Sequence, residues 1–261
     1  MSELISFKKD AGVGIITLSN APANCYSYEM MTQLDSAILE ARMAEDVHVI
    51  LLTGQGEKFF CAGADIAMLN DVTPTFKYYF CLHANETLNR LEQTPKLVIA
   101  ALNGHTVGGG LEVAMAADMR IAKKDGGKIG LPEVALGVLP GTGGTQRLSR
   151  MLGKSKALEL MITGKNLGFD EALALGLINQ VLPPENFTEG ALDFAKQFVP
   201  PNKAAMAVGR IKRAVTSGLE MSFGEGLALE RELQQQLFES SDAKEGIRAY
   251  VEKRNPEFTG G

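Results

Sequence analysis

The chain has few cysteines and no apolar run long enough to cross a membrane. Its 261 residues include three cysteines, Cys25, Cys61 and Cys81, and none forms a CxxC pair. Three thiols cannot all be bridged internally, so a reduced, intracellular setting is the simpler interpretation. Residues 1–10 lack the basic-then-apolar pattern of a signal peptide. The longest apolar runs, such as Leu97–Leu102, fall far short of the ~20 residues of a spanning helix. We therefore expect a soluble, cytoplasmic protein without a membrane span.

Motifs for metal binding and for nucleophilic catalysis are also missing. The three histidines, His48, His83 and His105, stand in no HExxH or other ligand spacing, so we expect no metal site. No serine lies in a GxSxG context. A Walker loop needs Lys and Ser/Thr after its last glycine, whereas Gly110 is followed by leucine and glutamate. Nucleotide-loop interpretations are therefore weak.

The chain has slightly fewer basic than acidic residues. The 26 Lys and Arg against 31 Asp and Glu give a formal net charge of −5. Nucleic-acid binding needs basic stripes that neutralise phosphates, so we expect no nucleic-acid partner. This balance does not exclude an anionic ligand held by a few local cations. A length of 261 residues indicates one large domain or a domain with an appendage, since domains usually span about 100–200 residues.

Short apolar runs alternate with helical patterns over the first two thirds of the chain. Val13–Leu18, Val47–Thr53 and Lys96–Asn103 are predicted strands, and Glu29–Glu45 carries apolar residues at helical spacing. Runs that are apolar on both faces suit a sheet covered by helices. The alternation predicts an α/β fold.

The last third changes character. Strand signals disappear from Asn186 onward, and Ala204–Val215 and Leu227–Phe238 show helical periodicity. We therefore divide the chain into an α/β core that carries the active site, residues 1–185, and a helical C-terminal region, residues 186–261.

Glycine-rich stretches follow two of the predicted strands. Gly108-Gly109-Gly110 stands at a strand-to-helix junction, where backbone N–H groups can face a ligand, and Gly63-Ala64 can supply a second donor. Together they would form an oxyanion hole. A tight turn with close packing is the alternative, and it would be preferred for a glycine triplet alone. The glutamate that follows this triplet directly, Glu112, weakens that alternative.

Two glutamates are candidates for acid and base chemistry. Glu112 is predicted in the first turn of a helix, and Glu133 lies 21 positions downstream, after Pro132, which can begin a helix. Each can face a ligand, or each can simply compensate a helix dipole. Their spacing in the sequence does not show that they meet.

Several ordered motifs together resemble the crotonase, or enoyl-CoA hydratase/isomerase, superfamily, and the resemblance runs nearly from end to end. The motifs are Asn20-Ala21-Pro22-Ala23-Asn24, Phe60-Cys61-Ala62-Gly63-Ala64-Asp65-Ile66, Ala101-Leu102-Asn103-Gly104 with Gly108-Gly109-Gly110-Leu111-Glu112, Leu131-Pro132-Glu133, Leu139-Pro140-Gly141, Gly144-Thr145-Gln146-Arg147-Leu148 and Tyr250-Val251-Glu252-Lys253-Arg254.

This resemblance implies a spiral of ββα turns, a C-terminal helical trimerisation region, and homotrimers that can pair into hexamers. It also implies acyl-CoA thioester ligands, with the N–H groups of Ala64 and Gly109 on the thioester oxygen. The implied CoA and substrate residues are Ala23, Ala62, Asp65, Ile66, Leu131, Pro132, Gly141 and Lys253, the last approaching a CoA phosphate.

Hydratases of this family carry a carboxylate at both glutamate positions, which favours an enoyl-CoA hydratase here. The hypothesis is that Glu112 activates water and Glu133 protonates C2 of the acyl chain. This chemistry needs no metal or redox cofactor, so none is expected, and CoA is part of the substrate. His105 is expected to be a loop histidine without a catalytic part.

Three other functions stay open at this point. One is a branched-chain or methylglutaconyl-CoA hydratase, and another is an enoyl-CoA isomerase. The third, from a different class, is an acyl-CoA-binding protein without turnover.

Overall fold

From β3 to β8, successive strands alternate between two sheets. The computed structural model describes residues 2–261. Six strands form the larger sheet in the order β1-β2-β3-β5-β7-β10, and four form the smaller one in the order β4-β6-β8-β9. The strands are β1 (Ile5–Asp10), β2 (Val13–Leu18), β3 (Val49–Gly54), β4 (Phe59–Cys61), β5 (Leu97–Leu102), β6 (His105–Val107), β7 (Met119–Lys123), β8 (Lys128–Gly130), β9 (Leu167–Gly168) and β10 (Gln180–Leu182).

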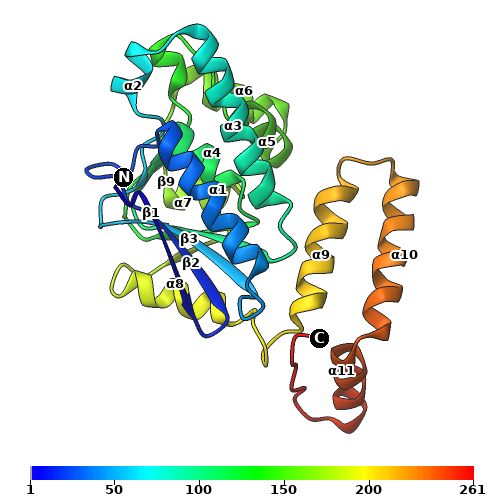
Figure 1. The fold of residues 1–261 in the computed structure, drawn as a ribbon. Helices are drawn as coiled ribbons and strands as arrows, with labels where there is room; N and C mark the ends of the chain where they lie inside the picture. The colour runs from blue at the N-terminus through cyan, green and yellow to red at the C-terminus, as the bar shows by residue number, and fades with distance from the viewer. Residues whose placement is uncertain (1) are drawn as a thin grey trace.

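A repeated unit generates both sheets. A strand of the larger sheet is followed by one of the smaller sheet and then by helix: β3-β4-α2, β5-β6-α4 and β7-β8-η1. This is the α/β spiral of ββα turns that the resemblance implies (Figure 1). The helical elements are α1 (Tyr28–Met43), α2 (Ile66–Asp71), α3 (Pro74–Glu92), α4 (Gly109–Met115), the 3-10 helix η1 (Glu133–Leu136), α5 (Gly144–Leu152), α6 (Lys154–Thr163), α7 (Phe169–Ala174), α8 (Phe187–Lys196), α9 (Ala205–Gly218), α10 (Phe223–Glu239) and α11 (Ser241–Glu252).

The core is built around the central parallel strands. All six residues of β5 are buried, as are five of the six residues of β3, because helices cover both faces of the larger sheet. On one face α8 packs Phe187, Ala191 and Ala195 against the strands. Each large apolar side chain buried in this way contributes about 1.5–3 kcal/mol.

Most of the predicted elements are present. The strand Val13–Leu18 has the predicted bounds, and the helix predicted over Glu29–Glu45 is α1. The three-residue strands β6 and β8 were not predicted, because three residues show no periodicity. The first helix of the predicted C-terminal region, α8, packs on the sheet. The division at residue 185 stays a prediction.

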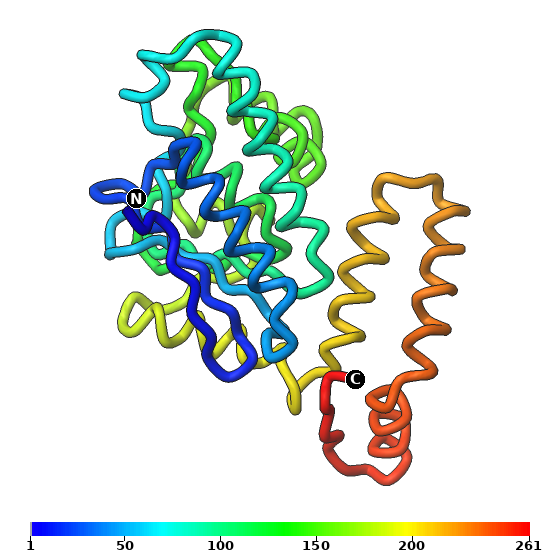
Figure 2. The backbone as a smooth tube through the Cα atoms, in the orientation of Figure 1, coloured from blue at the N-terminus to red at the C-terminus, as the bar shows by residue number. Residues whose placement is uncertain are grey.

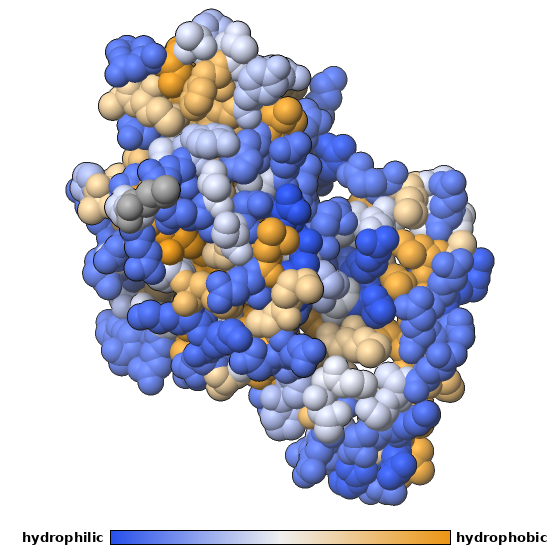
Figure 3. All heavy atoms as spheres, viewed as in Figure 1, coloured by the Kyte–Doolittle hydropathy of each residue, from blue (hydrophilic) through white to orange (hydrophobic). Residues whose placement is uncertain are grey.

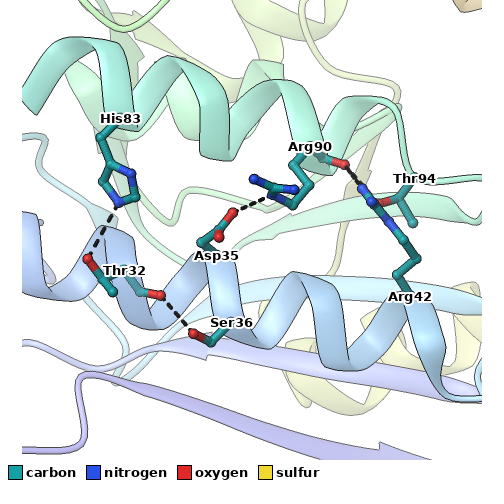
Figure 4. Close-up of polar contacts among 7 residues, drawn as sticks. All are labelled: Thr32, Asp35, Ser36, Arg42, His83, Arg90 and Thr94. Atoms are coloured by element: carbon teal, nitrogen blue, oxygen red, sulfur yellow. Dashed lines mark hydrogen bonds and ion pairs between the residues drawn. The ribbon is translucent and has the colours of Figure 1, made fainter. Parts of the chain in front are cut away.

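Helices α1 and α3 lie side by side and are joined by polar contacts (Figure 4). Arg90 of α3 pairs with Asp35 of α1, with 2.6 Å between Nε and Oδ1. Arg42 of α1 donates to the carbonyl oxygen of Arg90 at 2.6 Å and to Oγ1 of Thr94. These contacts fix α3, and Asn85 of α3 donates to the Gly141 carbonyl at 3.4 Å.

Helices α9, α10 and α11 form an appendage that projects from the core (Figures 1 and 2). The buried Lys212 of α9 joins it to the core, with its Nζ 2.8 Å from Asp118 Oδ2 and 3.0 Å from the carbonyl oxygen of Lys96. The C-terminal residues return to the base of the appendage (Figure 2), where the N–H of Phe258 donates to Pro201.

Apolar side chains remain uncovered on this appendage. Figure 3 shows hydrophobic atoms along the α9–α10 hairpin, and Leu219 and Phe223 are 78% and 83% exposed. Among residues 2–261, no helix combines the length and the apolarity that crossing a bilayer requires.

Candidate active site

Two loops that follow neighbouring parallel strands bring the predicted backbone donors together. β4 leads into Ala62–Asp65 and β6 leads into Gly108, and β4 pairs with β6 in parallel. Both loops therefore leave the same edge of the smaller sheet. Gly63 has a φ of +97°, and a Cβ there would lie only 3.0 Å from the Gly109 nitrogen. Glycine is required at Gly63 by its backbone conformation and by this close approach.

The backbone N–H groups of Ala64 and Gly109 donate to no acceptor within residues 2–261. Those on either side are used, since the Asp65 N–H donates to Tyr26 and the Gly108 N–H to Gly130. Gly109 is also the first residue of α4, where the positive end of the helix dipole lies. Two free donors side by side can bind one carbonyl oxygen.

The Glu112 carboxylate is buried and is held by one loop. Glu112 lies in the first turn of α4 and is 2% exposed. Its Oε1 accepts from the backbone nitrogens of Thr142 and Gly144, each at 2.7 Å, and its Oε2 accepts from the Thr142 hydroxyl. Three donors therefore fix the orientation of this carboxylate.

Glu133 has the opposite environment. It begins η1, and its Oε2 is buried without a hydrogen-bond partner within residues 2–261. A Cβ on Gly108 would lie 3.2 Å from its Oε1, so the carboxyl group faces the turn that precedes Gly109. Burial raises the pKa of Glu133 to about 7, and the charge of Glu112 acts in the same direction.

The structure thus brings the two glutamates and the two donors to one place. The Glu133 carboxyl group faces Gly108, Glu112 lies in the first turn of the helix that Gly109 begins, and Gly63 approaches the Gly109 nitrogen. No group of three or more His, Cys, Asp or Glu side chains in residues 2–261 is arranged to hold a metal ion. The roles of these four residues in a reaction stay predictions.

Comparison with known proteins identifies the family. The enoyl-CoA hydratase/isomerase family model matches residues 8–261. This chain belongs to that family.

Relatives of this family member match it over nearly their whole length. A short-chain-enoyl-CoA hydratase of Clostridium acetobutylicum is 37% identical, over 97% of this chain and 96% of the relative. A probable enoyl-CoA hydratase of Mycobacterium tuberculosis is 39% identical over 98% of both chains.

Solved structures of enoyl-CoA hydratases have the same fold. One from Geobacillus kaustophilus superposes with a TM-score of 0.96 at 44% identity, covering 100% of this chain and 98% of the other. One from Bacillus anthracis has a TM-score of 0.93 at 33% identity, covering 99% and 100%.

Apart from Lys253, the residues predicted to contact CoA or the rest of the substrate form two groups near the site. Ala62 donates its N–H to Ala23 at 3.0 Å, Asp65 caps α2 by accepting from Ala67 at 2.9 Å, and Ile66 is 56% exposed. Ala23, Ala62, Asp65 and Ile66 therefore lie along one edge of the first loop.

The second group surrounds the loop that holds Glu112. Leu131 is buried, and a Cβ on Gly144 would lie 3.1 Å from its Cδ1. Pro132 directly precedes Glu133 as the N-cap of η1. The Gly141 carbonyl accepts from Asn85 of α3 at 3.4 Å.

Lys253 is the one predicted site residue that lies apart. It is exposed and ends α11, at the far end of the appendage from α2 and α4 (Figure 1). His105 accepts from the Lys128 N–H at 3.1 Å through Nδ1, and its ring packs on Phe59.

Sequence reasoning missed Tyr26 and Thr142. The Tyr26 side chain is buried, its hydroxyl lies 3.2 Å from Thr142 Oγ1, and Thr142 in turn binds Glu112. The two residues are 116 positions apart, so no local pattern could pair them.

Proposed function

We propose that this protein is an enoyl-CoA hydratase. It would add water reversibly across the C2=C3 bond of a 2-enoyl-CoA thioester to give the 3-hydroxyacyl-CoA. The observation that carries this proposal is the presence of two carboxyl groups in opposite environments beside two free backbone donors. The names of the relatives support it.

The backbone donors serve the thioester. Addition of water at C3 places enolate charge on the thioester oxygen, and the N–H groups of Ala64 and Gly109 bind that oxygen as the charge develops. Because the donors are fixed before the reaction, they need no reorganisation, and such a donor contributes about 3–4 kcal/mol.

The two glutamates divide the proton transfers. Glu112 accepts a proton from the attacking water, since three hydrogen-bond donors hold its carboxylate in one orientation. Glu133 gives a proton to C2, because burial raises its pKa to about 7 and it still holds a proton near neutral pH. In dehydration the two roles exchange.

The CoA moiety lies along the edge of the first loop in this proposal. The residues proposed to contact CoA or the acyl group are Ala23, Ala62, Asp65, Ile66, Leu131, Pro132 and Gly141. Lys253 caps α11, which lies at the opposite end of the molecule from α2 (Figure 1), so we assign Lys253 to the CoA phosphate of a neighbouring protomer. The reaction needs no separate cofactor.

The proposed assembly is a homotrimer or a hexamer of two trimers, in the cytoplasm. Two features support an assembly. The α9–α10 hairpin leaves apolar side chains exposed, and a groove of about 1180 Å³ separates α9 from the core. Surfaces of this kind are typical of protein interfaces.

Glutamine substitutions test the proposed chemistry. Glu112→Gln and Glu133→Gln keep the size of each side chain but remove its ability to exchange a proton. We expect each variant to hydrate crotonyl-CoA about 100- to 10,000-fold more slowly, with its affinity for acyl-CoA retained. The rate is followed by the loss of enone absorbance, and binding by calorimetry with a saturated acyl-CoA. A near-wild-type rate in either variant would overturn that residue's assignment.

A further inference from the structure

Tyr26 lies against both proposed backbone donors and reaches Glu112 through the Thr142 hydroxyl. Its backbone brackets Ala64, since the Tyr26 N–H donates to Gly63 at 2.9 Å and the Tyr26 carbonyl accepts from Asp65 at 3.0 Å. Its side chain fills the space beside Gly109, where a Cβ would overlap the phenol oxygen. One residue thus fixes the positions of both backbone donors.

The Tyr26 hydroxyl also begins a chain of hydrogen bonds that ends at Glu112. Thr142 has one hydroxyl proton, and an ionised carboxylate only accepts, so that proton goes to Oε2 of Glu112. Tyr26 must then be the donor in its 3.2 Å contact with Thr142 Oγ1. The phenol remains a donor over the working pH range, because burial raises its pKa well above 10.

The loop that carries Thr142 is held on its other side as well. Arg147 of α5 donates to the Thr142 carbonyl at 3.4 Å, and the same guanidinium pairs with Glu92 at 2.9 Å. Arg147 therefore ties the Thr142 backbone to α3, which ends at Glu92. The two hydroxyl groups therefore have one pattern of donation: the Tyr26 hydroxyl donates to Thr142, and the Thr142 hydroxyl donates to Glu112.

We propose that Tyr26 is a positioning residue that aligns the two oxyanion donors and, through the Thr142 hydroxyl, the carboxylate of Glu112. This inference rests on the proposed role of Glu112 as the base. Neither the Tyr26 side chain nor the Thr142 side chain exchanges a proton with substrate. Both act by holding the base in the orientation that the attacking water requires.

Removal of the hydroxyls tests this role. A hydrogen bond to a charged group corresponds to about a ten-fold or larger effect, and one between neutral hydroxyls to about two- to ten-fold. We expect Thr142→Val to lower kcat on crotonyl-CoA by about ten-fold or more, and Tyr26→Phe by about two- to ten-fold, with KM within about two-fold of wild type. Thr142→Ser restores the hydroxyl and should return kcat to within about three-fold of wild type.

The two substitutions should not be additive. Once Thr142→Val has broken the chain, the further change Tyr26→Phe should lower kcat little more. Matched controls are Tyr28→Phe and Thr87→Val. Neither hydroxyl has a hydrogen-bond partner among residues 2–261, so kcat should not change in either variant.

Three results would overturn the positioning role. They are wild-type kcat in both Tyr26→Phe and Thr142→Val, a change in KM or melting temperature alone, and a failure of Thr142→Ser to restore kcat. If any one of these results occurs while Glu112→Gln is inactive, only the positioning role fails. If Glu112→Gln is active as well, the proposed base is wrong.

Discussion

The two glutamates of the site differ in the partners that surround them. Glu112 accepts three hydrogen bonds from the 142–144 loop, whereas Glu133 buries an oxygen without any partner among residues 2–261. A carboxylate needs donors to remain charged in a buried place, and a protonated carboxyl group does not. This difference in environment is the basis for proposing Glu112 as the base and Glu133 as the acid.

The raised pKa of Glu133 makes a prediction about stability. The folded protein holds this proton up to a pKa of about 7, whereas the ordinary pKa of a glutamate carboxyl group is 4.5. Its contribution to stability is therefore fully present below about pH 4.5 and is lost as the pH rises through 7. Glutamine has no such proton, so Glu133→Gln should become more stable relative to wild type between pH 5 and pH 8.

Urea unfolding of both proteins at several pH values measures this difference. The exposed Glu185→Gln variant serves as the control, and its difference from wild type should not vary with pH in the same way. A Glu133→Gln difference that is constant from pH 5 to pH 8 would contradict the assignment of a raised pKa.

Some residues of this site could be predicted from the local sequence, and others could not. Glu112 could be predicted, because it directly follows a glycine triplet at a strand-to-helix junction. Tyr26 and Thr142 could not, because their contact depends on loops 116 positions apart. The environment of Glu133 was equally hidden, since burial of an oxygen is a property of packing.

At the scale of elements, parallel pairing of short strands assembles the site. β4 and β6 pair in parallel, so the loops that follow them share an edge of the smaller sheet. Strands β2, β3 and β5 could be predicted because each is a six-residue run of mainly apolar or β-branched residues. The three-residue strands β6 and β8 were not, because only their neighbours in the sheet define them.

The α9–α10 hairpin makes a prediction about assembly. Phe223 begins α10 and is 83% exposed, an unfavourable position for an aromatic ring unless another chain covers it. We expect the protein to sediment at three or six times the 28.0 kDa of one chain. Phe223→Glu should lower that mass, and a negative charge at a helix N-terminus leaves the helix itself stable.

Analytical ultracentrifugation across a concentration series measures this. Met43→Glu, at an exposed position that ends α1 in the core, is the matched control and should keep the wild-type mass. A wild-type protein that is monomeric at every concentration would contradict the proposed assembly.

At the scale of the whole molecule, the core holds the candidate site and the appendage extends away from it (Figure 1). The alternation of strands and helices predicted the α/β class, and the ordered motifs predicted the spiral. The net charge of −5 does not exclude binding of CoA, because a CoA phosphate needs only a local cation, and Lys253 is the one proposed here. In the proposed assembly, the position of Lys253 relative to a site depends on the neighbouring protomer, which one sequence does not determine.

The central claim is that this protein adds water across the C2=C3 bond of a 2-enoyl-CoA. Incubation with crotonyl-CoA in D₂O enriched in ¹⁸O, followed by mass spectrometry, tests it most directly. The account predicts a 3-hydroxyacyl-CoA that carries ¹⁸O on C3 and one deuterium on C2. Deuterium in a shifted alkene without ¹⁸O would indicate an isomerase, and unchanged crotonyl-CoA under saturating binding would indicate a protein that only binds. Either result would contradict the account.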